Sequence, residues 1–401
     1  MIYNIVVLLI KNDERKFHFM DNKENNFSPG QQSINSKNPF DNFTEYEDYN
    51  SDYHDIVHQL DIPGCVIPFE PSRDEKKNIR YYFNIAGGAM LVHLFASYGI
   101  MILLRLILKH IVMKRDGVSS SEATVQYLRG LDNFFDNSSI GIGINMLVLG
   151  FLSIIIFLIG SKISGIKIES YFKTKNLTFR ELLSYGIISF FIRYIGGIAG
   201  TAFGAVFSGA DMSVGSEMMN YKSPRTITVM LVYACFVAPL TEEIMYRGLI
   251  LKNLSRVSQR FGIIMSALLF GLMHGNVSQF IFAFFMGIFF AHINIKHNSL
   301  LPSMIIHSFV NIISSAISYS GLLDSMTGVF IAGLLMMTMG VAGIFLFIRF
   351  HKSDRLPYTM PHQKRRNSSA FSSVLLVMTI ALHLFLTIVN SFPAVSEKLF
   401  G

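Results

Sequence analysis

The sequence of 401 residues has few charged side chains: Asp, Glu, Lys and Arg make up 15% of it, whereas hydrophobic residues make up 51%. Soluble domains carry about 25% charged residues. A soluble core of this size would need a polar shell that this composition does not supply, and the mean hydropathy of +0.42 agrees. The scarcity of charge therefore excludes an ordinary soluble globular protein and indicates a membrane protein.

Cysteine is also scarce, because the sequence has only Cys65 and Cys235. One lies in a polar N-terminal region and the other in an apolar run, which excludes a disulfide framework or a site of several Cys ligands. The net charge is +7, yet no basic stripe is interleaved with aromatic residues. Lys and Arg lie mostly in short loops between apolar runs, so no nucleic-acid partner is expected, whereas membrane lipids are.

Two regions follow one another along the chain. Residues 1–80 contain a segment, 21–70, that is rich in Asn, Ser, Asp, Glu and Pro, and this composition predicts a disordered polar tail. From residue 82 onward apolar runs alternate with short polar loops. Spans are expected at about 83–108, 140–164, 183–208, 226–252, 261–276, 279–295, 299–320, 327–350 and 371–391. The expected fold is an all-α, polytopic transmembrane helix bundle of about eight to nine spans.

Some of these spans have special features. The fifth and sixth are short and nearly fused, so we expect a tight helical hairpin packed inside the bundle. The third contains Gly196, Gly200 and Gly204 at four-residue spacing, which predicts a helix-packing face. Basic loop residues fall mostly on the side that the N-terminus shares. That asymmetry predicts a cytoplasmic N-terminus and an odd number of spans. The Asn-rich tail and the lack of an organelle signal favour a multi-pass protein of the plasma membrane.

The fourth span carries two adjacent carboxylates, Glu242 and Glu243, and then Arg247. Charged groups inside a span are costly and need individual explanation. Arg247 follows Glu243 by four residues, which favours an ion pair on one helical face. Glu242 is then free to face a reacting group, as a general base does. Pro239 removes a backbone hydrogen bond and predicts a kink one turn earlier. The alternative is that Glu242, Glu243 and Arg247 form a buried polar network with a structural role only.

The fifth span supplies His274. If the fourth and fifth spans fold back about Ser258, Glu242 and His274 both lie 16 residues from that turn, at about the same depth. A Glu and a His at matched depth can share one water. A lone His in a span is more often a helix-to-helix hydrogen bond, and we give that reading to His93, His292 and His383.

The seventh span supplies His307 and Asn311, which share one face of the helix because of their i, i+4 spacing. A neutral His and an Asn amide can donate hydrogen bonds to a developing oxyanion. Should a metal bind, Glu242, His274 and His307 are the expected ligands, since one Glu and two His form a known zinc set. The sequence contains no His-Glu-x-x-His motif, so zinc is permitted but not specified.

Two arginines also lie in spans. Arg105 is near the end of the first span and can snorkel to the interface. Arg193, in the third, could neutralise one of the two adjacent carboxylates or line the cavity.

The ordered motifs Glu242-Glu243-x-x-x-Arg247, Phe270-x-x-x-His274 and His307-x-x-x-Asn311 resemble those of the CPBP family, the CAAX prenyl-protease and bacteriocin-processing group. The resemblance covers about residues 180–320. It implies a catalytic core at 181–322, flanked by spans at 81–180 and 323–401.

The resemblance further implies an α-helical intramembrane endopeptidase in which Glu242 and His274 activate water. His307 and Asn311 would stabilise the tetrahedral intermediate, with Glu243 and Arg247 in support. Family members are often labelled metalloendopeptidases, and a metal-free, glutamate-dependent mechanism is equally defensible, so the cofactor stays open.

Three functions are compatible with these motifs. An endopeptidase would cleave a peptide or protein substrate at or in the bilayer, such as a lipid-modified C-terminus, a peptide pheromone or a bacteriocin leader. A non-catalytic immunity or scaffold protein would use the same polar residues to join helices. A transporter would also need buried charges, but the sequence shows no inverted repeat of half-helices.

Overall fold

The computed structural model describes residues 70–116, 121–168, 171–172, 177–208, 223–320, 324–356, 359 and 361–392. Throughout these ranges the secondary structure is helical, without a strand, which confirms the all-α class. All of them belong to one unit, Glu45–Gly401. The disordered polar tail that we predicted within residues 1–80 lies outside the described residues as far as residue 69. Residues 73–80, in contrast, form the start of the first helix.

The first helix, α2 (Arg73–Arg115), begins with a capping box. The Ser72 hydroxyl accepts the amide of Glu75, and the Glu75 carboxylate accepts the amide of Ser72. These two bonds satisfy backbone donors that a helix start leaves open. With 43 residues, α2 is about 64 Å long and extends well beyond a hydrocarbon core of about 30 Å.

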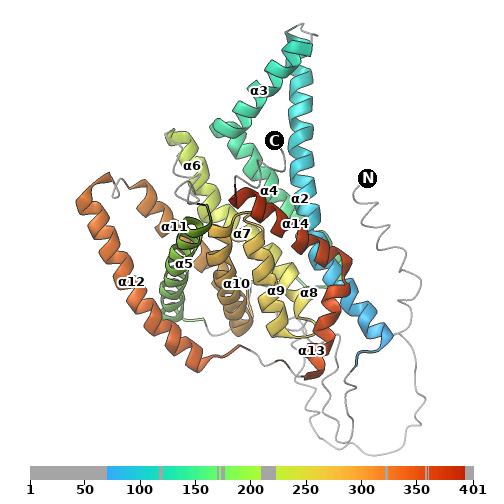
Figure 1. The fold of residues 1–401 in the computed structure, drawn as a ribbon, viewed down its shortest axis with the longest axis vertical. Coiled ribbons are helices and arrows are strands. Elements are labelled where there is room, and N and C mark those ends of the chain that lie inside the picture. The colour runs from blue at the N-terminus through green and yellow to red at the C-terminus, as the bar shows by residue number, and fades with distance from the viewer. Residues whose placement is uncertain are drawn as a thin grey trace, which may run out of the picture. The chain divides into compact units, whose positions relative to one another are not determined.

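The projecting part of α2 is accompanied by α3 (Ser121–Asn137), which returns beside it (Figure 1). Arg105 donates from Nε to Asp132 at 2.9 Å and from a terminal nitrogen to Asp136 at 3.3 Å. Ion pairs with α3 therefore hold Arg105. The sequence predicts only a polar connection between the spans at 83–108 and 140–164, so α3 was not predicted as a helix.

Eight helices of the described residues are long and apolar enough to cross a membrane. They are α2, α4 (Ser139–Ser164), α5 (Phe179–Ser208), the continuous helix Pro224–Ser255, α10 (Val277–His297), α11 (Leu301–Tyr319), α12 (Met326–Ser353) and α14 (Val374–Ser391). The shorter α9 (Gln259–Leu272) occupies the fifth predicted span. The chain is thus a multi-pass membrane protein, and the described residues agree with the expected eight to nine spans. The odd number of spans stays a prediction.

The helices α9 and α10 form the predicted hairpin. They pack so closely that a Cβ on Gly287 would come within 2.9 Å of the Ala267 backbone. The turn between them contains Gly275 at a positive φ of 66°, a conformation that glycine adopts readily. Asn276 then starts α10, its side chain accepting the amide of Gln279 at 2.8 Å.

The helix Pro224–Ser255 is irregular in the middle. It comprises α6 (Pro224–Val232), the π-helical segment η5 (Tyr233–Val237), α7 (Ala238–Glu243), a second π-helical segment η6 (Ile244–Ile250) and α8 (Leu251–Ser255). Such π segments are rare and frequently occur at functional sites. The two here flank Pro239 and the adjacent carboxylates. The helix irregularity that we predicted from Pro239 is therefore seen as a change from α-helical to π-helical hydrogen bonding.

The glycine ridge of α5 faces α10. A Cβ on Gly196 would lie 2.5 Å from the Cβ of Phe282, and one on Gly200 would lie 2.8 Å from the carbonyl oxygen of Ser278. The predicted helix-packing face is confirmed for these two residues, whereas the surroundings of Gly204 lie outside the described part.

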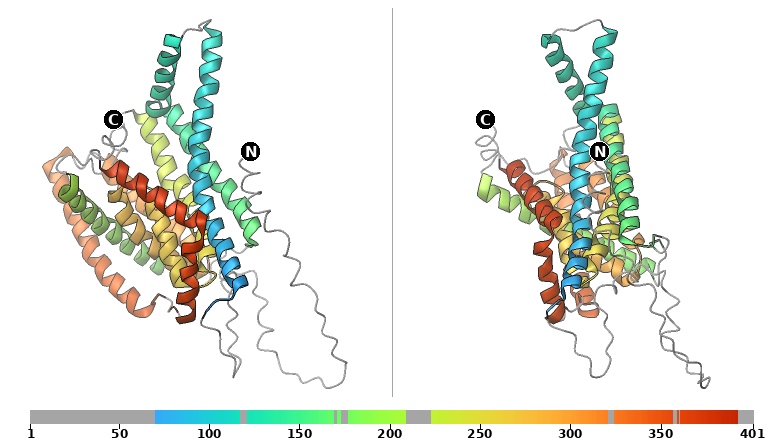
Figure 2. Two further views of the ribbon diagram at one scale, coloured as in Figure 1. Left: turned by 45° about the vertical axis from the view of Figure 1, so that its right-hand side comes forward. Right: turned by 90° about the vertical axis from the view of Figure 1, so that its right-hand side faces the viewer.

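The chain returns to its first helix at the end. After α13 (Pro361–Asn367) and the short 3-10 helix η8 (Ser368–Ser372), α14 packs against α2 (Figure 2). Thr379 donates to the carbonyl oxygen of Gly87 at 2.7 Å. The neighbouring core is apolar, with fully buried side chains in η6, α8 and α9, including Ile250, Leu254 and Leu269.

One end of the bundle gathers the basic loops, and we call it the basic end. Arg366 pairs with Glu75 at 3.1 Å, and Arg256 donates to the carbonyl oxygen of Ser164 at 2.7 Å. A set of polar side chains from α5, α10 and the end of α12 also lies there, and we call it the rim cluster: Glu181, Tyr185, His292, Lys296 and Asp354. These contacts join loops that the charge asymmetry had placed on one side.

Candidate active site

The first motif forms a buried ion pair. Nη1 of Arg247 lies 2.9 Å from Oε1 of Glu243, and the side chains are 1% and 0% exposed. The pair joins α7 to η6, as the i, i+4 spacing predicted. Such a pair is stable inside a bundle only when further groups satisfy its charges.

His307 of α11 completes this arrangement. Its Nδ1 lies 3.2 Å from Oε1 of Glu243, and its Nε2 lies 3.9 Å from Oε2 of Glu242. We call Glu242, Glu243, Arg247 and His307 the site cluster. Two carboxylates and one guanidinium leave one negative charge.

Aromatic rings enclose the cluster. The Arg247 guanidinium lies 4.2 Å from the ring centre of Phe270 and 5.4 Å from that of Phe290. The His307 ring contacts the same two side chains, at 6.1 and 5.4 Å between ring centres. These cation–π and edge contacts exclude water from the pair. Sequence reasoning missed Phe290, because nothing in its neighbourhood distinguishes it from other phenylalanines of α10.

His274 follows the end of α9, and its ring lies 5.2 Å from that of Phe270 between centres. Its Nδ1 is 2.9 Å from the carbonyl oxygen of Phe270. A carbonyl only accepts, so Nδ1 carries a proton and, in the neutral ring, Nε2 keeps its lone pair. Glu242 is 13 residues from Ser255 and His274 is 15 from Gln259, so the two lie a similar number of residues from the basic end. Their sharing of a water stays a prediction.

Asn311 bonds to the backbone of η5. In this segment residue i donates to residue i−5, as Ala238 does to Tyr233. The next residue, Pro239, has no N–H, so the carbonyl of Ala234 loses that donor. The side-chain amide of Asn311 donates to this carbonyl oxygen at 2.7 Å. One amide hydrogen of Asn311 is therefore engaged, and the second is available to another acceptor.

Arg193 does not pair with the adjacent carboxylates. Its guanidinium lies over the ring of Phe282, 4.8 Å from the centre, and the Phe282 ring lies 6.3 Å from that of His274. Of the two roles that we considered for Arg193, neutralisation of Glu242 or Glu243 is not seen.

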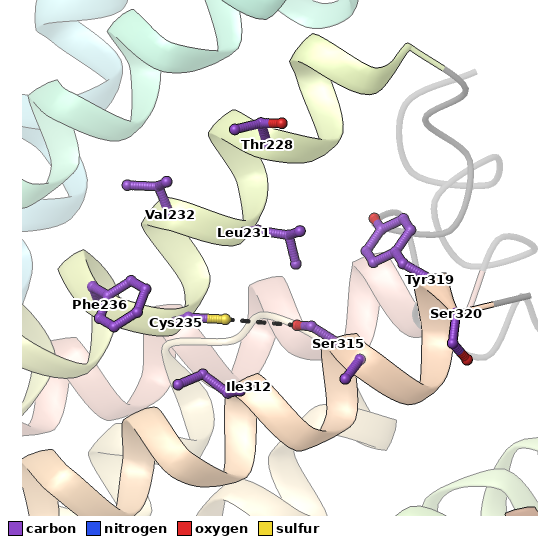
Figure 3. A pocket seen from close by; sticks show the side chains of 10 residues that line it. Thr228, Leu231, Val232, Cys235, Phe236, Ile312, Ser315, Tyr319 and Ser320 are labelled. Atoms are coloured by element: carbon purple, nitrogen blue, oxygen red, sulfur yellow. Dashed lines mark hydrogen bonds between the residues drawn. The ribbon is translucent and has the colours of Figure 1, made fainter.

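A largely apolar cavity of about 510 Å³ adjoins this region (Figure 3). It lies between the α6–η5 segment and α11, where Leu231, Ile312 and Tyr319 line the space between the two helices. Cys235 Sγ and Ser315 Oγ are 3.9 Å apart at its wall. Ser315 follows Asn311 by one helical turn, so the cavity begins beside the Asn311–Ala234 bond. Sequence reasoning missed this cavity because it depends on how two distant helices pack.

The described residues do not assemble a metal site. No three His, Cys, Asp or Glu side chains among them are arranged so as to hold an ion together. The set that we predicted should a metal bind, Glu242, His274 and His307, is thus not brought together as ligands. The Phe270 ring contacts both histidine rings, at 5.2 Å and 6.1 Å between ring centres.

Comparison with known families gives one match. Residues 224–313 match the family model described as Type II CAAX prenyl endopeptidase Rce1-like. This segment runs from the start of α6 into α11 and contains all six predicted site residues, Glu242, Glu243, Arg247, His274, His307 and Asn311. The match confirms the resemblance to the CPBP family for this part of the chain. Searches of curated proteins and of solved structures found no match.

Proposed function

We propose that this protein is an intramembrane endopeptidase that cleaves the C-terminal peptide of a prenylated, CAAX-type protein. The observation that carries the proposal is the site cluster, in which Glu243, Arg247 and His307 are buried and Glu242 is 20% exposed. The cluster lies inside the segment that matches CAAX prenyl endopeptidases. The adjoining apolar cavity supports a lipid-modified substrate, since its volume falls in the range of about 300–1,000 Å³ usual for ligand sites.

In the proposed reaction Glu242 is the general base. It takes a proton from a water molecule, whose oxygen forms a bond to the carbonyl carbon of the peptide while the carbonyl electrons move to its oxygen. His274 accepts a hydrogen bond from the same water through Nε2 and so orients it. The geometry supports this role because the Phe270 carbonyl engages the other ring nitrogen.

The oxyanion then needs donors. In the proposed reaction His307 supplies an N–H from Nε2, and Asn311 supplies its second amide hydrogen. Glu243 and Arg247 hold the His307 ring through Nδ1 and are positioning residues. As the C–N bond breaks, the proton held by Glu242 passes to the leaving nitrogen, which yields a carboxylic acid and an amine. The second proton of the water then passes from the acid to the amine, so the products are a carboxylate and an ammonium group. No step is routed through a metal, since the donor geometry does not fit one.

The test is cleavage of a farnesylated C-a-a-X peptide by the purified full chain in proteoliposomes. We expect Glu242→Gln and His274→Ala each to lower kcat by about 10²- to 10⁴-fold, as removal of a general base does. Matched controls are Glu181→Gln in the rim cluster and His351→Ala on the exposed end of α12, which should keep wild-type turnover. Turnover that survives both site substitutions contradicts the proposal, and chelator-resistant activity would support the metal-free route.

A non-catalytic immunity or scaffold protein is the second candidate. It is favoured by the bonds that join helices through the site residues, His307 to Glu243 and Asn311 to Ala234. On this alternative the same substitutions lower stability or assembly, and the wild-type protein cleaves no peptide.

We also propose that the basic end faces the cytoplasm at the plasma membrane, as its loop charges favour. A cysteine replacing Ser320 at the far end of α11 should react with a membrane-impermeant thiol reagent in intact cells. One replacing Ser353 at the basic end of α12 should not. The opposite pattern contradicts this orientation.

A further inference from the structure

Arg193 lies in the middle of α5. It is 14 residues from Phe179 and 15 from Ser208, about 21 and 22 Å from the two ends at 1.5 Å per residue. An Arg side chain is too short to reach either interface from there. Charged groups at such depth face the bundle interior, are paired, or mark a substrate path.

No protein carboxylate among the described residues balances this charge. Of the two neighbouring carboxylates in the fourth span, Glu243 already contacts Arg247 and His307. The other, Glu242, contacts His307. Arg193 is half-buried and rests on the Phe282 ring, which provides a cation–π contact but no negative charge. An anion that is supplied from outside the chain would satisfy it.

The position of Arg193 relative to the reacting groups is restricted. The guanidinium carbon is 4.8 Å from the Phe282 ring centre, which is 6.3 Å from the His274 ring centre. Arg193 therefore lies no more than about 11 Å from His274, the limit that these two distances set. The contact of Gly196 with Phe282 holds α5 against α10 one turn further along and so maintains this spacing.

We propose that Arg193 binds the C-terminal carboxylate of the substrate. The inference rests on the proposed endopeptidase function and names the group that fixes where the substrate is cut. A C-a-a-X sequence ends with three residues after its cysteine, and three extended residues span about 10 Å. With the carboxylate on Arg193, the peptide bond after the cysteine reaches the water held at His274. A guanidinium suits this task because its fork matches a carboxylate in a bidentate way.

The test compares two substrates on one enzyme preparation: a farnesylated C-a-a-X peptide with a free C-terminal carboxylate, and the same peptide as its C-terminal amide. The ratio of their kcat/KM values does not depend on the fraction of active enzyme. We expect the wild type to prefer the acid by about 10- to 100-fold, the range for a hydrogen bond to a charged group. In Arg193→Gln the ratio should fall to about one, mainly through a higher KM for the acid, and Arg193→Lys should give an intermediate ratio.

The control is Arg105→Gln, which removes a cation from a different span and should keep the wild-type ratio. If a variant folds without turnover, competition between the two peptides for binding yields the same ratio. A wild-type ratio of one overturns the proposal, as does an unchanged ratio in Arg193→Gln. Absence of any cleavage by the wild type contradicts the endopeptidase function instead, so the two failures are distinguishable.

Discussion

The site cluster and the rim cluster contain the same kinds of side chain, carboxylates, a cation and histidine, in different surroundings. In the site cluster the Arg247 and Glu243 side chains are 1% and 0% exposed. In the rim cluster the Lys296 and Glu181 side chains are 31% and 33% exposed. Charges at helix ends keep contact with water, whereas charges in mid-bundle need a counter-charge. The interior cluster is therefore the one that calls for a functional explanation.

The backbone differs in the same way. The rim cluster belongs to α5, α10 and the end of α12, which are regular α-helices. The site cluster lies between two π-helical segments, and a side chain from α11 replaces the backbone donor that Pro239 lacks. Irregular backbone inside a membrane is tolerated where neighbouring helices satisfy the freed polar groups. The irregularity and the buried charge thus occur together at one place.

The largest expected effect follows from removing one partner of the interior pair. Arg247→Met leaves Glu243 buried without its main counter-charge and should lower the free energy of unfolding by about 3–5 kcal/mol. Replacing both partners, with Glu243→Gln and Arg247→Met together, should recover most of this loss, because no uncompensated charge remains. Unfolding in mixed micelles measures both variants. If Arg247→Met alone lowers the free energy of unfolding by less than about 1 kcal/mol, the site cluster does not differ from the rim cluster in its contribution to stability.

The next effect concerns the close approach of α5 and α10, the two helices that carry most of the rim cluster. In Gly196→Ala the added Cβ meets the Phe282 Cα at 2.7 Å, so the helices must separate, and overpacking of this kind costs about 1–3 kcal/mol. Peptidase activity should fall as well, because Phe282 adjoins His274. Gly197→Ala is the matched control, since a Cβ there meets nothing within 4 Å. Equal stabilities of the two variants would mean that the ridge does not set the helix spacing.

A smaller effect tests the backbone difference. Asn311→Ala removes the donor to the Ala234 carbonyl and should destabilise the protein by about 1 kcal/mol, the net worth of one hydrogen bond. Pro239→Ala restores a backbone N–H. In that background Asn311→Ala should cost less stability, because the helix can supply its own donor. A double-mutant cycle on unfolding free energies measures this coupling. If the two losses are strictly additive, Asn311 does not replace the backbone donor that Pro239 lacks.

Much of the fold could be predicted from local sequence. Spans follow from the length of apolar runs, and Gly196 and Gly200 indicate a packing face through their spacing alone. The helix α3 could not be predicted in this way. It is amphipathic, its Asp132 and Asp136 face Arg105, and this partner lies about 30 residues away in sequence.

For the site, the sequence predicts pairs within one helix and not those between helices. Glu243 and Arg247 are four residues apart, so their ion pair could be anticipated. The contact of Glu242 with His307 and that of Asn311 with Ala234 depend on how α11 docks against the fourth span. A change to π register likewise results from packing around Pro239, and no residue pattern marks where it begins or ends.

The smallest effect belongs to the rim cluster. Lys296→Gln removes a cation whose Nζ lies 3.6 Å from Glu181 and 3.7 Å from Asp354. Because these side chains contact water, the loss should be about 0–1 kcal/mol and should shrink further at high salt. Unfolding in mixed micelles at low and high ionic strength measures it beside Arg247→Met, whose larger loss should change little with salt since the interior pair is screened much less. If instead Lys296→Gln proves as damaging as Arg247→Met, exposure does not separate the two clusters, and burial of the Glu243–Arg247 pair loses its value as a sign of function.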